Sequence, residues 1–225
     1  MIRKTVEPQY QKLLKIQEER GVTQLGIMTN QVWHDDPRRV AFMMSRYKFV
    51  SKMFSGRKKV AEAGCGDAFC TRIVKQEVRE LHVYDFDPLF IADIKQRVDS
   101  NWPLEAYAHN LLDAPLPHGP YDAIYSLDVM EHIAQDQEHL YIGNLRDSLA
   151  TGGALMIGTP SLESQHYASL QSKEGHINCK SGKELKKLLE KTFRNVFLFS
   201  MNDEVVHTGF SPMAHYLLAL CCEPR

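Results

Sequence analysis

Short apolar runs alternate with amphipathic stretches over most of the chain from residue 58 onward. Runs of strand length occupy residues 59–63, 81–85, 105–108, 123–127 and 154–159. Helical periodicity fills most of the gaps between them, and strands that alternate with helices build a parallel sheet with helices on both faces. Two further runs, 196–200 and 215–222, are separated by a polar loop without a helical pattern. The last strand is therefore predicted to pair antiparallel at the edge of the sheet.

The chain before residue 57 has a helical pattern of its own. A first helix ends at Gly21, and a second, stronger helix begins at Asp36 and Pro37. The apolar stripe of the second helix contains Val40, Met43, Met44, Tyr47 and Val50. We therefore divide the chain into an N-terminal helical extension, residues 1–56, and a core domain, residues 57–225.

The first strand of the core domain runs into a turn with two glycines. Glu62 is followed by Gly64 and Gly66, and a helical pattern resumes at Ala68. Glycines in such a turn let the backbone approach a ligand closely, and the N–H groups of the following helix point at it. A dinucleotide site would need a small residue where Phe69 stands, which weakens the prediction of a nicotinamide oxidoreductase. An ordinary tight turn between strand and helix is the structural alternative.

A carboxylate ends the second strand of the core domain. Asp85 stands about 20 residues beyond the glycines, the spacing from which a carboxylate reaches a ribose diol. Aspartates are common at strand ends on protein surfaces, but this spacing after a glycine turn favours ribose binding.

Five segments stand in the order found in class I S-adenosylmethionine (SAM) dependent methyltransferases. They read VAEAGCGDAF, VYDFDP, YDAIYSLDVMEHI, LATGGALMIGTPS and EGHINCKSGKELKKLLEKTF. From residue 58 to 222 the chain most resembles the group that contains the ubiquinone-biosynthesis O-methyltransferases. The resemblance implies an α/β fold with a Rossmann-like, mostly parallel sheet of seven strands, an antiparallel last strand and helices on both faces.

The resemblance also implies a SAM site. The residues that it assigns to SAM in the core domain are Glu62, Gly64, Gly66, Asp85, Phe86, Asn110, Leu111 and Asp128. The glycines would meet the methionine end, Asp85 and Phe86 the ribose and one adenine face, and Asn110 the adenine edge, where the family usually has an aspartate. Arg46 lies beside the apolar stripe of the N-terminal extension and is predicted to meet the cofactor's carboxylate, with residues 1–56 acting as a lid.

Histidines supply the candidates for the proton-transfer step. Methyl transfer from a sulfonium needs an in-line nucleophile, the exclusion of water and a sink for the nucleophile's proton. His176 follows the fifth strand among polar residues, and an imidazole titrates near neutral pH, so we predict His176 as the catalytic base with His132 in reserve. The alternative is a divalent metal ion held by Asp128, Glu131 and His132, which stand at positions i, i+3 and i+4. We expect that no metal is required.

Composition narrows the class of partner. The chain has 27 Lys and Arg against 28 Asp and Glu, so it lacks the positive charge that favours nucleic acid or an anionic membrane. Its five cysteines have neither metal-ligand nor disulfide spacing, which predicts a reduced, cytoplasmic setting. We predict methyl transfer to a small-molecule acceptor, with a hydroxyl ahead of an amine. A SAM-binding regulator without turnover is the alternative, and the sequence makes no prediction of oligomeric state.

Overall fold

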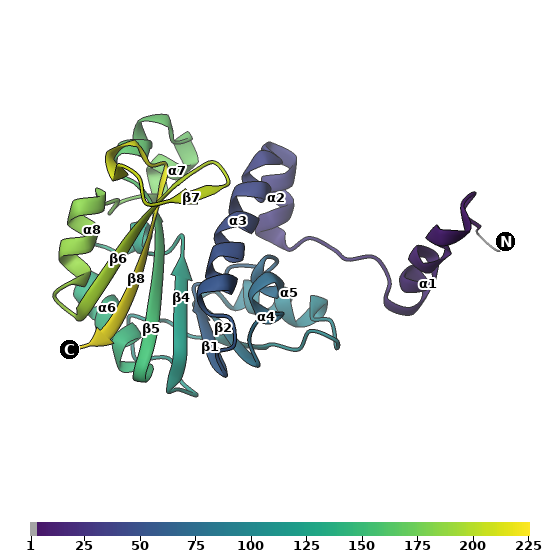
Figure 1. Ribbon diagram of the computed structural model, residues 1–225, viewed down its shortest axis with the longest axis horizontal. Helices are drawn as coiled ribbons and strands as arrows, with labels where there is room; N and C mark the ends of the chain where they lie inside the picture. The colour runs from purple at the N-terminus through teal and green to yellow at the C-terminus, as the bar shows by residue number, and fades with distance from the viewer. Residues whose placement is uncertain (1–3) are drawn as a thin grey trace.

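A mixed sheet forms the centre of the structure, a computed structural model that describes residues 4–225 (Figure 1). The strand order is β3-β2-β1-β4-β5-β8-β6-β7. The strands are β1 Lys59–Ala63, β2 Glu80–Asp85, β3 Glu105–Ala108, β4 Tyr121–Leu127, β5 Leu149–Pro160, β6 Phe193–Asn202, β7 Val205–His207 and β8 Tyr216–Pro224. Strands β1 to β5 pair in parallel, as the alternation of strands and helices predicts.

The C-terminal part of the sheet differs from the prediction in two respects. The sheet has eight strands rather than seven, because the polar loop after β6 contains the short strand β7. The last strand, β8, is antiparallel as predicted, but it lies between β5 and β6 and not at the edge. Residues 216–219 of β8 are all buried. Burial of apolar surface stabilises the fold, and a strand that is apolar on both faces buries most of its surface in the interior of a sheet. This explains the position of β8 between two other strands.

Helices cover both faces of the sheet, as Figure 1 shows. They are α1 Gln11–Arg20, α2 Ile27–Asp35, α3 Arg38–Met53, α4 Thr71–Lys75, α5 Pro88–Arg97, α6 Glu138–Asp147, α7 Leu170–Gly175 and α8 Gly182–Leu189. Side chains alternate across a strand, so Val60 of β1 packs with α3, α4 and α5, whereas Ala61 packs with α6 and α8. Four short 3-10 helices complete the described chain: η1 Pro8–Tyr10, η2 Met130–His132, η3 Glu163–Tyr167 and η4 Ser211–Met213.

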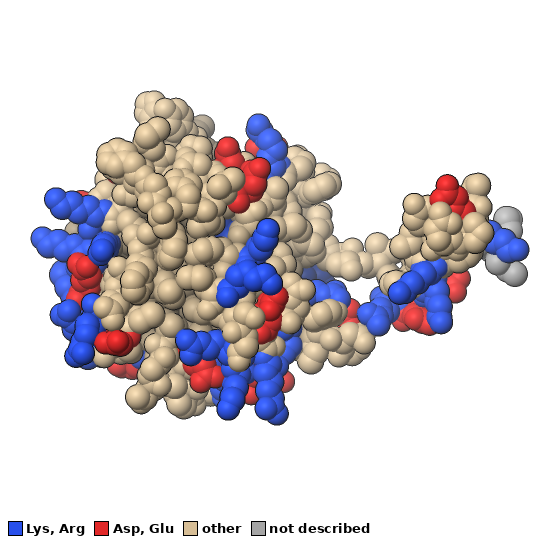
Figure 2. Space-filling view, viewed as in Figure 1, with Lys and Arg blue, Asp and Glu red and all other residues tan. Residues whose placement is uncertain are grey.

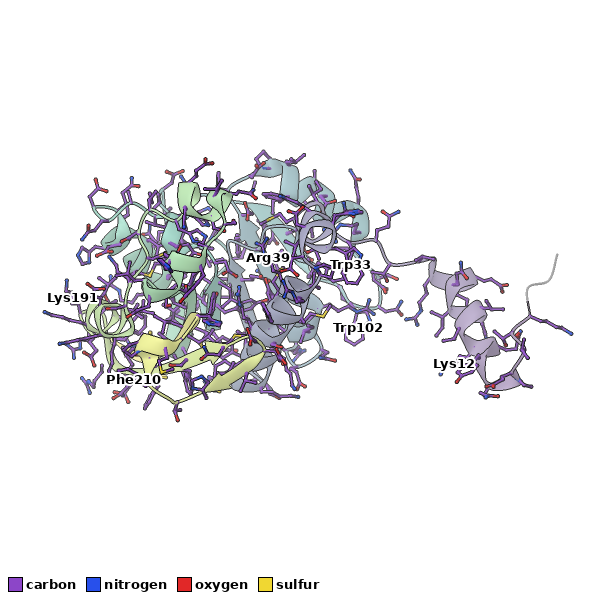
Figure 3. The ribbon with its side chains drawn as sticks, turned by 90° about the horizontal axis from the view of Figure 1, so that it is seen from above. Lys12, Trp33, Arg39, Trp102, Lys191 and Phe210 are labelled. Carbon is purple, nitrogen blue, oxygen red and sulfur yellow. The ribbon has the colours of Figure 1, made fainter. Side chains whose placement is uncertain are left out.

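The predicted N-terminal extension consists of two different parts. Helix α1 carries no buried residue, and it stands away from the body in two views at right angles, where Lys12 marks it in Figure 3. In contrast, Val50 of α3 and Phe54, which directly follows the helix, are completely buried in the core cluster that packs on the sheet. The hydrophobic effect therefore fixes α3 to the core domain, whereas α1 has no such contact.

Helix α2 is fastened to the glycine turn by a carboxylate from outside the helix. Asp67 Oδ2 accepts the N–H of Thr29 at 2.6 Å, and Oδ1 accepts the Thr29 hydroxyl at 3.0 Å. The first N–H groups of a helix lack intrahelical partners and attract negative charge, so Asp67 caps α2. Gly26 allows this contact, because any side chain there would overlap the carboxyl group of Asp67.

The substitution Gly26→Ala should release α2 from the turn. An added methyl group displaces Asp67 and removes one or both hydrogen bonds, a loss of about 1–3 kcal/mol. We expect amide hydrogen exchange across residues 27–35 to become roughly 5- to 150-fold faster by mass spectrometry. Gly143→Ala is the matched control, because a Cβ at Gly143 of α6 meets no atom within 4 Å. Equal exchange of residues 27–35 in wild type and Gly26→Ala would contradict this contact.

Candidate cofactor and acceptor site

The carboxyl ends of four neighbouring parallel strands bring the predicted SAM residues together. Strands β3, β2, β1 and β4 are adjacent in the sheet. Gly64 follows β1, Asp85 ends β2, Asn110 follows β3 and Asp128 follows β4. Open α/β sheets bind their ligands in the crevice outside the carboxyl ends of such strands. These four residues therefore border one candidate site.

The glycine turn after β1 has a backbone that few other residues adopt. Gly64 and Gly66 have φ angles of 76° and 51°. A side chain at Gly64 would overlap Val129, and a Cβ at Gly66 would lie 2.6 Å from the sulfur of Met28 in α2. The two glycines thus let the loop after β4 and the helix α2 approach the turn closely.

Asp85 is anchored to the glycine turn. Its Oδ2 accepts the N–H of Gly66 at 2.8 Å, and its Oδ1 accepts the N–H of Asp87 at 2.9 Å. Burial raises the pKa of Asp85 above its ordinary value, although these backbone N–H groups act in the opposite direction. A carboxylate has about four lone-pair sites, so acceptor capacity remains on both oxygens for a ribose diol. Phe86, next in the chain, is 76% exposed and leaves a ring face free.

Asn110 and Leu111 form an ordered loop after β3. Asn110 Oδ1 accepts the N–H of Leu112 at 3.1 Å, which leaves the side-chain amide nitrogen as a donor. The Leu111 carbonyl accepts the side-chain amide of Asn144 at 2.7 Å. The predicted contact of Asn110 with the adenine edge would therefore use the amide nitrogen as a donor.

Glu62 is enclosed by hydroxyl groups. Its carboxylate accepts the hydroxyls of Tyr47, Thr71 and Tyr125 at 2.5, 2.5 and 2.6 Å. The residue is 1% exposed, and burial raises the pKa of Glu62 to about 7 against the opposing effect of these hydrogen bonds. Glu62 thus ties α3, α4 and β4 to the strand that leads into the glycine turn. Its direct contact with SAM stays a prediction.

Arg46 and Asp128 form an ion pair at the carboxyl end of β4. Arg46 Nη1 lies 2.9 and 2.7 Å from the two carboxylate oxygens of Asp128. The guanidinium stacks on the ring of Tyr216 at 3.8 Å, and its Nε is buried without a hydrogen-bond partner. The structure therefore pairs Arg46 with the carboxylate of Asp128, and the contact of Arg46 with the carboxylate of SAM stays a prediction.

Glu131, His132 and His176 converge in a second group of functional side chains. One carboxylate oxygen of Glu131 and one ring nitrogen of each histidine lie within 4.8 Å of one another. Asp128, which the sequence grouped with Glu131 and His132, is paired with Arg46, and His176 takes its place in the cluster. The backbone explains this exchange, because the N–H of Asn178 donates to the Glu131 carbonyl at 3.0 Å and holds the loop of His176 against η2.

Each member of the cluster has one hydrogen-bond partner of its own. His132 Nδ1 lies 2.8 Å from the Gly175 carbonyl, and His176 Nδ1 lies 2.8 Å from Gln165 Oε1. Glu131 is fully buried, and burial followed by the charge of Asp128 raises the pKa of Glu131 to about 8. Burial, and then the neighbouring His132, lowers the pKa of His176. Gln165 carried no sequence signal, because its role depends only on this long-range contact.

A cavity of about 470 Å³ opens beside His176. It is lined by Pro160, Ser164, Gln165, Tyr167, Ala168, His176 and His215. The chain segments that supply its lining also expose large apolar side chains. The face in Figure 2 carries few charges over α7, β7 and η4. Tyr167 and Leu170 are 84% and 83% exposed. The cavity can therefore accept a small molecule with an apolar body.

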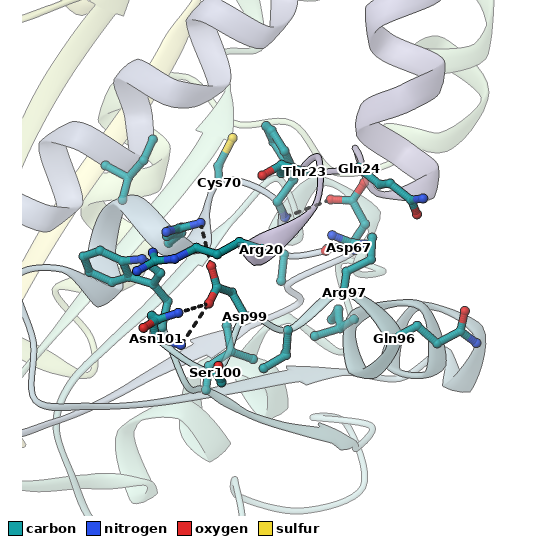
Figure 4. Close-up of a pocket in the computed structure, with 18 of the residues that line it drawn as sticks. Arg20, Thr23, Gln24, Asp67, Cys70, Gln96, Arg97, Asp99, Ser100 and Asn101 are labelled. Carbon is teal, nitrogen blue, oxygen red and sulfur yellow. Dashed lines mark hydrogen bonds and ion pairs between the residues drawn. The ribbon is translucent and has the colours of Figure 1, made fainter. Parts of the chain in front are cut away.

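A larger cavity, of about 900 Å³, lies elsewhere (Figure 4). It is bordered by the end of α1 and the chain that follows it, by residues 67–70 after the glycine turn, and by α4 and α5, with Asp99 and Arg97 among its labelled residues. Arg72 stacks over Trp102 there at 4.7 Å. The cavity contains none of the predicted SAM residues, so its volume alone does not make it the functional site.

Comparison with known sequences gives the family. Residues 32–192 match the model of a methyltransferase domain family. The chain belongs to this family. A probable SAM-dependent methyltransferase of Mycobacterium tuberculosis is 28% identical to this chain over 123 residues. The match covers 53% of this chain and 43% of the relative. A tRNA U34 carboxymethyltransferase of Shewanella pealeana is 25% identical over 121 residues, 52% of this chain and 36% of the relative. The chain thus matches less than half the length of these relatives.

Solved structures agree with the family. The N-methyltransferase NodS of Bradyrhizobium japonicum, in complex with S-adenosyl-L-homocysteine (SAH), has a TM-score of 0.60 and 19% identity to this methyltransferase, over 86% of this chain and 91% of that one. This likeness confirms the predicted Rossmann-like fold. The chain therefore contains a methyltransferase domain of this fold. In residues 4–225 of the methyltransferase, no helix has the length and apolar character to cross a membrane.

The buried Glu62 should make stability depend on pH. Its folded pKa of about 7 exceeds the ordinary value of 4.5, so the folded state binds more protons between these values and loses stability as pH rises. Glu62→Gln cannot ionise, and its unfolding free energy should rise by about 3 kcal/mol relative to wild type from pH 4.5 to pH 8. Urea unfolding at both pH values measures this. A difference between the two proteins that does not change with pH would contradict the ionisation of a buried Glu62.

Asp85→Asn should weaken the binding of SAM. The amide keeps the shape of the side chain but loses the negative charge, and a charge-assisted hydrogen bond contributes about 1–3 kcal/mol. We expect a dissociation constant roughly 5- to 150-fold higher by calorimetry. Asp136→Asn, at an exposed position, is the control. Unchanged affinity in folded Asp85→Asn would exclude Asp85 from the ribose site.

Proposed function

We propose that the methyltransferase transfers the methyl group of SAM to a hydroxyl group of a small, largely apolar molecule. The observation that carries this proposal is the cavity beside His176, which adjoins the cluster of Glu131, His132 and His176. Asp128, at the SAM end, precedes this cluster by three residues. The donor and the acceptor would thus meet at the ends of β4 and β5. The resemblance to the ubiquinone-biosynthesis O-methyltransferases is part of this proposal and favours an oxygen acceptor.

The cavity walls support a small acceptor over a macromolecular one. The cavity of about 470 Å³ lies within the size range of sites for small organic ligands. Its lining contains no Lys or Arg, and the chain as a whole has a formal charge of −1. Phosphate contacts by Lys and Arg supply most of the affinity for nucleic acid, so a tRNA acceptor is disfavoured.

The reaction requires the hydroxyl to lose its proton as the new bond forms. A carbonyl oxygen only accepts hydrogen bonds, so the Nδ1 of His132 that faces Gly175 carries a proton and its Nε2 is free. If His176 Nδ1 donates to Gln165 Oε1, its Nε2 is free as well. In the proposed reaction these nitrogens face the acceptor and assist its deprotonation, while α2 and α3 exclude water from the SAM side.

An acceptor screen tests the proposed reaction. Purified protein is incubated with SAM and separate panels of phenols and aliphatic alcohols, small amines and bulk tRNA, and the release of SAH is measured. We expect turnover with members of the hydroxyl panel. Turnover with amines or tRNA alone would contradict hydroxyl transfer. SAM binding without turnover in any panel would support the alternative, a SAM-binding regulator.

Filling the cavity should separate acceptor binding from SAM binding. Ala168→Trp places an indole in the cavity, and we expect the KM for the acceptor to rise at least about 10-fold with the dissociation constant of SAM unchanged. Leu140→Trp, on the exposed side of α6, is the control. An unchanged KM in folded Ala168→Trp would show that the acceptor binds elsewhere.

A further inference from the structure

We propose that two copies of this chain exchange arms, so that the arm of one copy docks in the 900 Å³ cavity of the other. The arm is the segment formed by η1 and α1, residues 8–20. The cavity is the one bordered by the chain after α1 and by α4 and α5 (Figure 4). The inference does not depend on the proposed methyl acceptor. It assigns α1 to an interface between copies rather than to the lid expected from the sequence.

One side of the arm is apolar and uncovered. Tyr10, Leu13 and Ile16 lie within one arc of the helix, and they are 51%, 60% and 41% exposed. Lys15 and Glu19 lie on the opposite side, where they form an exposed ion pair at 3.7 Å. An isolated helix of ten residues is marginally stable in water, so α1 gains stability from a surface that covers its apolar side.

The cavity offers such a surface. The apolar part of its lining comes from α4, α5 and the chain beside them, and includes Phe69, Ile73, Ile94, Val98 and Trp102. Trp102 is labelled in Figure 3, at the side of the body from which the arm extends. Apolar side chains of an amphipathic helix and the apolar floor of a groove bury each other when they dock.

The charged groups of the cavity favour an apolar occupant over a charged ligand. Two of the three arginines that line it are engaged in ion pairs, Arg72 with Asp99 at 3.5 Å and Arg97 with Asp93 of its own helix. The third, Arg20, belongs to the last turn of α1. An anionic ligand would have to displace these carboxylates, whereas an apolar helix face needs only the apolar lining.

The chain's own arm cannot fill the cavity without rebuilding it. Glu19 and Arg20 at the end of α1, and residues 22–24 after it, form part of the cavity wall. Gly21 between them has a φ angle of 73°, which favours glycine, and from this turn α1 leads away from the body (Figure 1). The occupant therefore comes from outside the chain, and a second copy supplies an arm with the required apolar side.

The exposed surface of the chain has the excess that a dimer would remove. The chain exposes 12750 Å² to solvent. A compact monomer of its mass, 25.8 kDa, exposes about 10,500 Å². The excess of about 2,300 Å² is comparable to the area that a stable interface buries, roughly 1,200–2,000 Å². Exchange around a two-fold axis uses each arm and each cavity once, so the assembly closes as a dimer.

A membrane is a less suitable partner for the arm. Helices that lie on anionic membranes are rich in Lys and Arg on their polar face. Helix α1 has Lys12, Lys15 and Arg20 against Glu18 and Glu19, so its charges nearly balance.

Sedimentation equilibrium of the full chain measures the exchange. We expect wild type to form a dimer at micromolar concentration. A glutamate at Leu13 or Trp102 buries a charge in the proposed contact, so dimerisation should be at least about 10-fold weaker in Leu13→Glu and in Trp102→Glu. The matched controls are Gln11→Glu, on the polar side of α1, and Ala92→Glu, at an exposed position of α5 outside the cavity lining, and both should dimerise as wild type does. SAH affinity and melting temperature verify that each variant is folded.

Mixing the two weakened variants tests the pairing of arm with cavity. The Leu13→Glu chain keeps an intact cavity and the Trp102→Glu chain keeps an intact arm, so an equimolar mixture can form one of the two contacts. We expect the mixture to associate more tightly than either variant alone.

Each alternative arrangement gives a different result. A wild-type chain that stays monomeric overturns the exchange. If that monomer also sediments with phosphatidylglycerol vesicles and Leu13→Glu does not, the arm binds membranes instead. Dimers that are lost in Leu13→Glu but unchanged in Trp102→Glu show that the arms pair with each other and not with the cavity. A mixture that associates no better than the separate variants also contradicts the exchange.

Discussion

The buried carboxylate of Glu62 is the contact on which the arrangement of the site depends. Its three hydroxyl donors come from α3, α4 and β4, and Glu62 itself stands two positions before Gly64, the first glycine of the turn. A buried carboxylate requires such donors, because an unsatisfied charge in the protein interior is strongly destabilising. Since Tyr47 is one of the donors, the same interaction also positions its neighbour Arg46 above Asp128. One polar contact thus orders both the turn and the helix that covers it.

Two acidic residues three positions apart have opposite surroundings, and this contrast separates the two halves of the site. Asp128 is neutralised by Arg46, and its contact with SAM stays a prediction. Glu131 has the hydroxyl of Thr159 on one oxygen and no partner on the other. The chain bends sharply between them, since Asp128 has a φ of 56°. The backbone thereby directs one carboxylate toward α3 and the other toward the histidines.

The sequence predicted those features that depend on local order, and missed those that depend on distant contacts. Alternating strands and helices gave β1 to β5, and strand ends placed Asp85 and Asp128 correctly. Helix α2 was missed, because its capping carboxylate comes from Asp67, 38 residues away. The spacing of Glu131 and His132 was recognised, but the third member of their cluster could not be found from spacing, because a contact over 43 residues between His132 and Gly175 brings it there.

The most direct test of this account is a crystal structure with SAH. The account predicts SAH along the carboxyl ends of β3, β2, β1 and β4, with its ribose on Asp85 and its sulfur directed toward the cavity beside His176. SAH bound instead in the 900 Å³ cavity near Trp102, or a ribose away from Asp85, would contradict the central claim that this edge of the sheet is the methyl-transfer site.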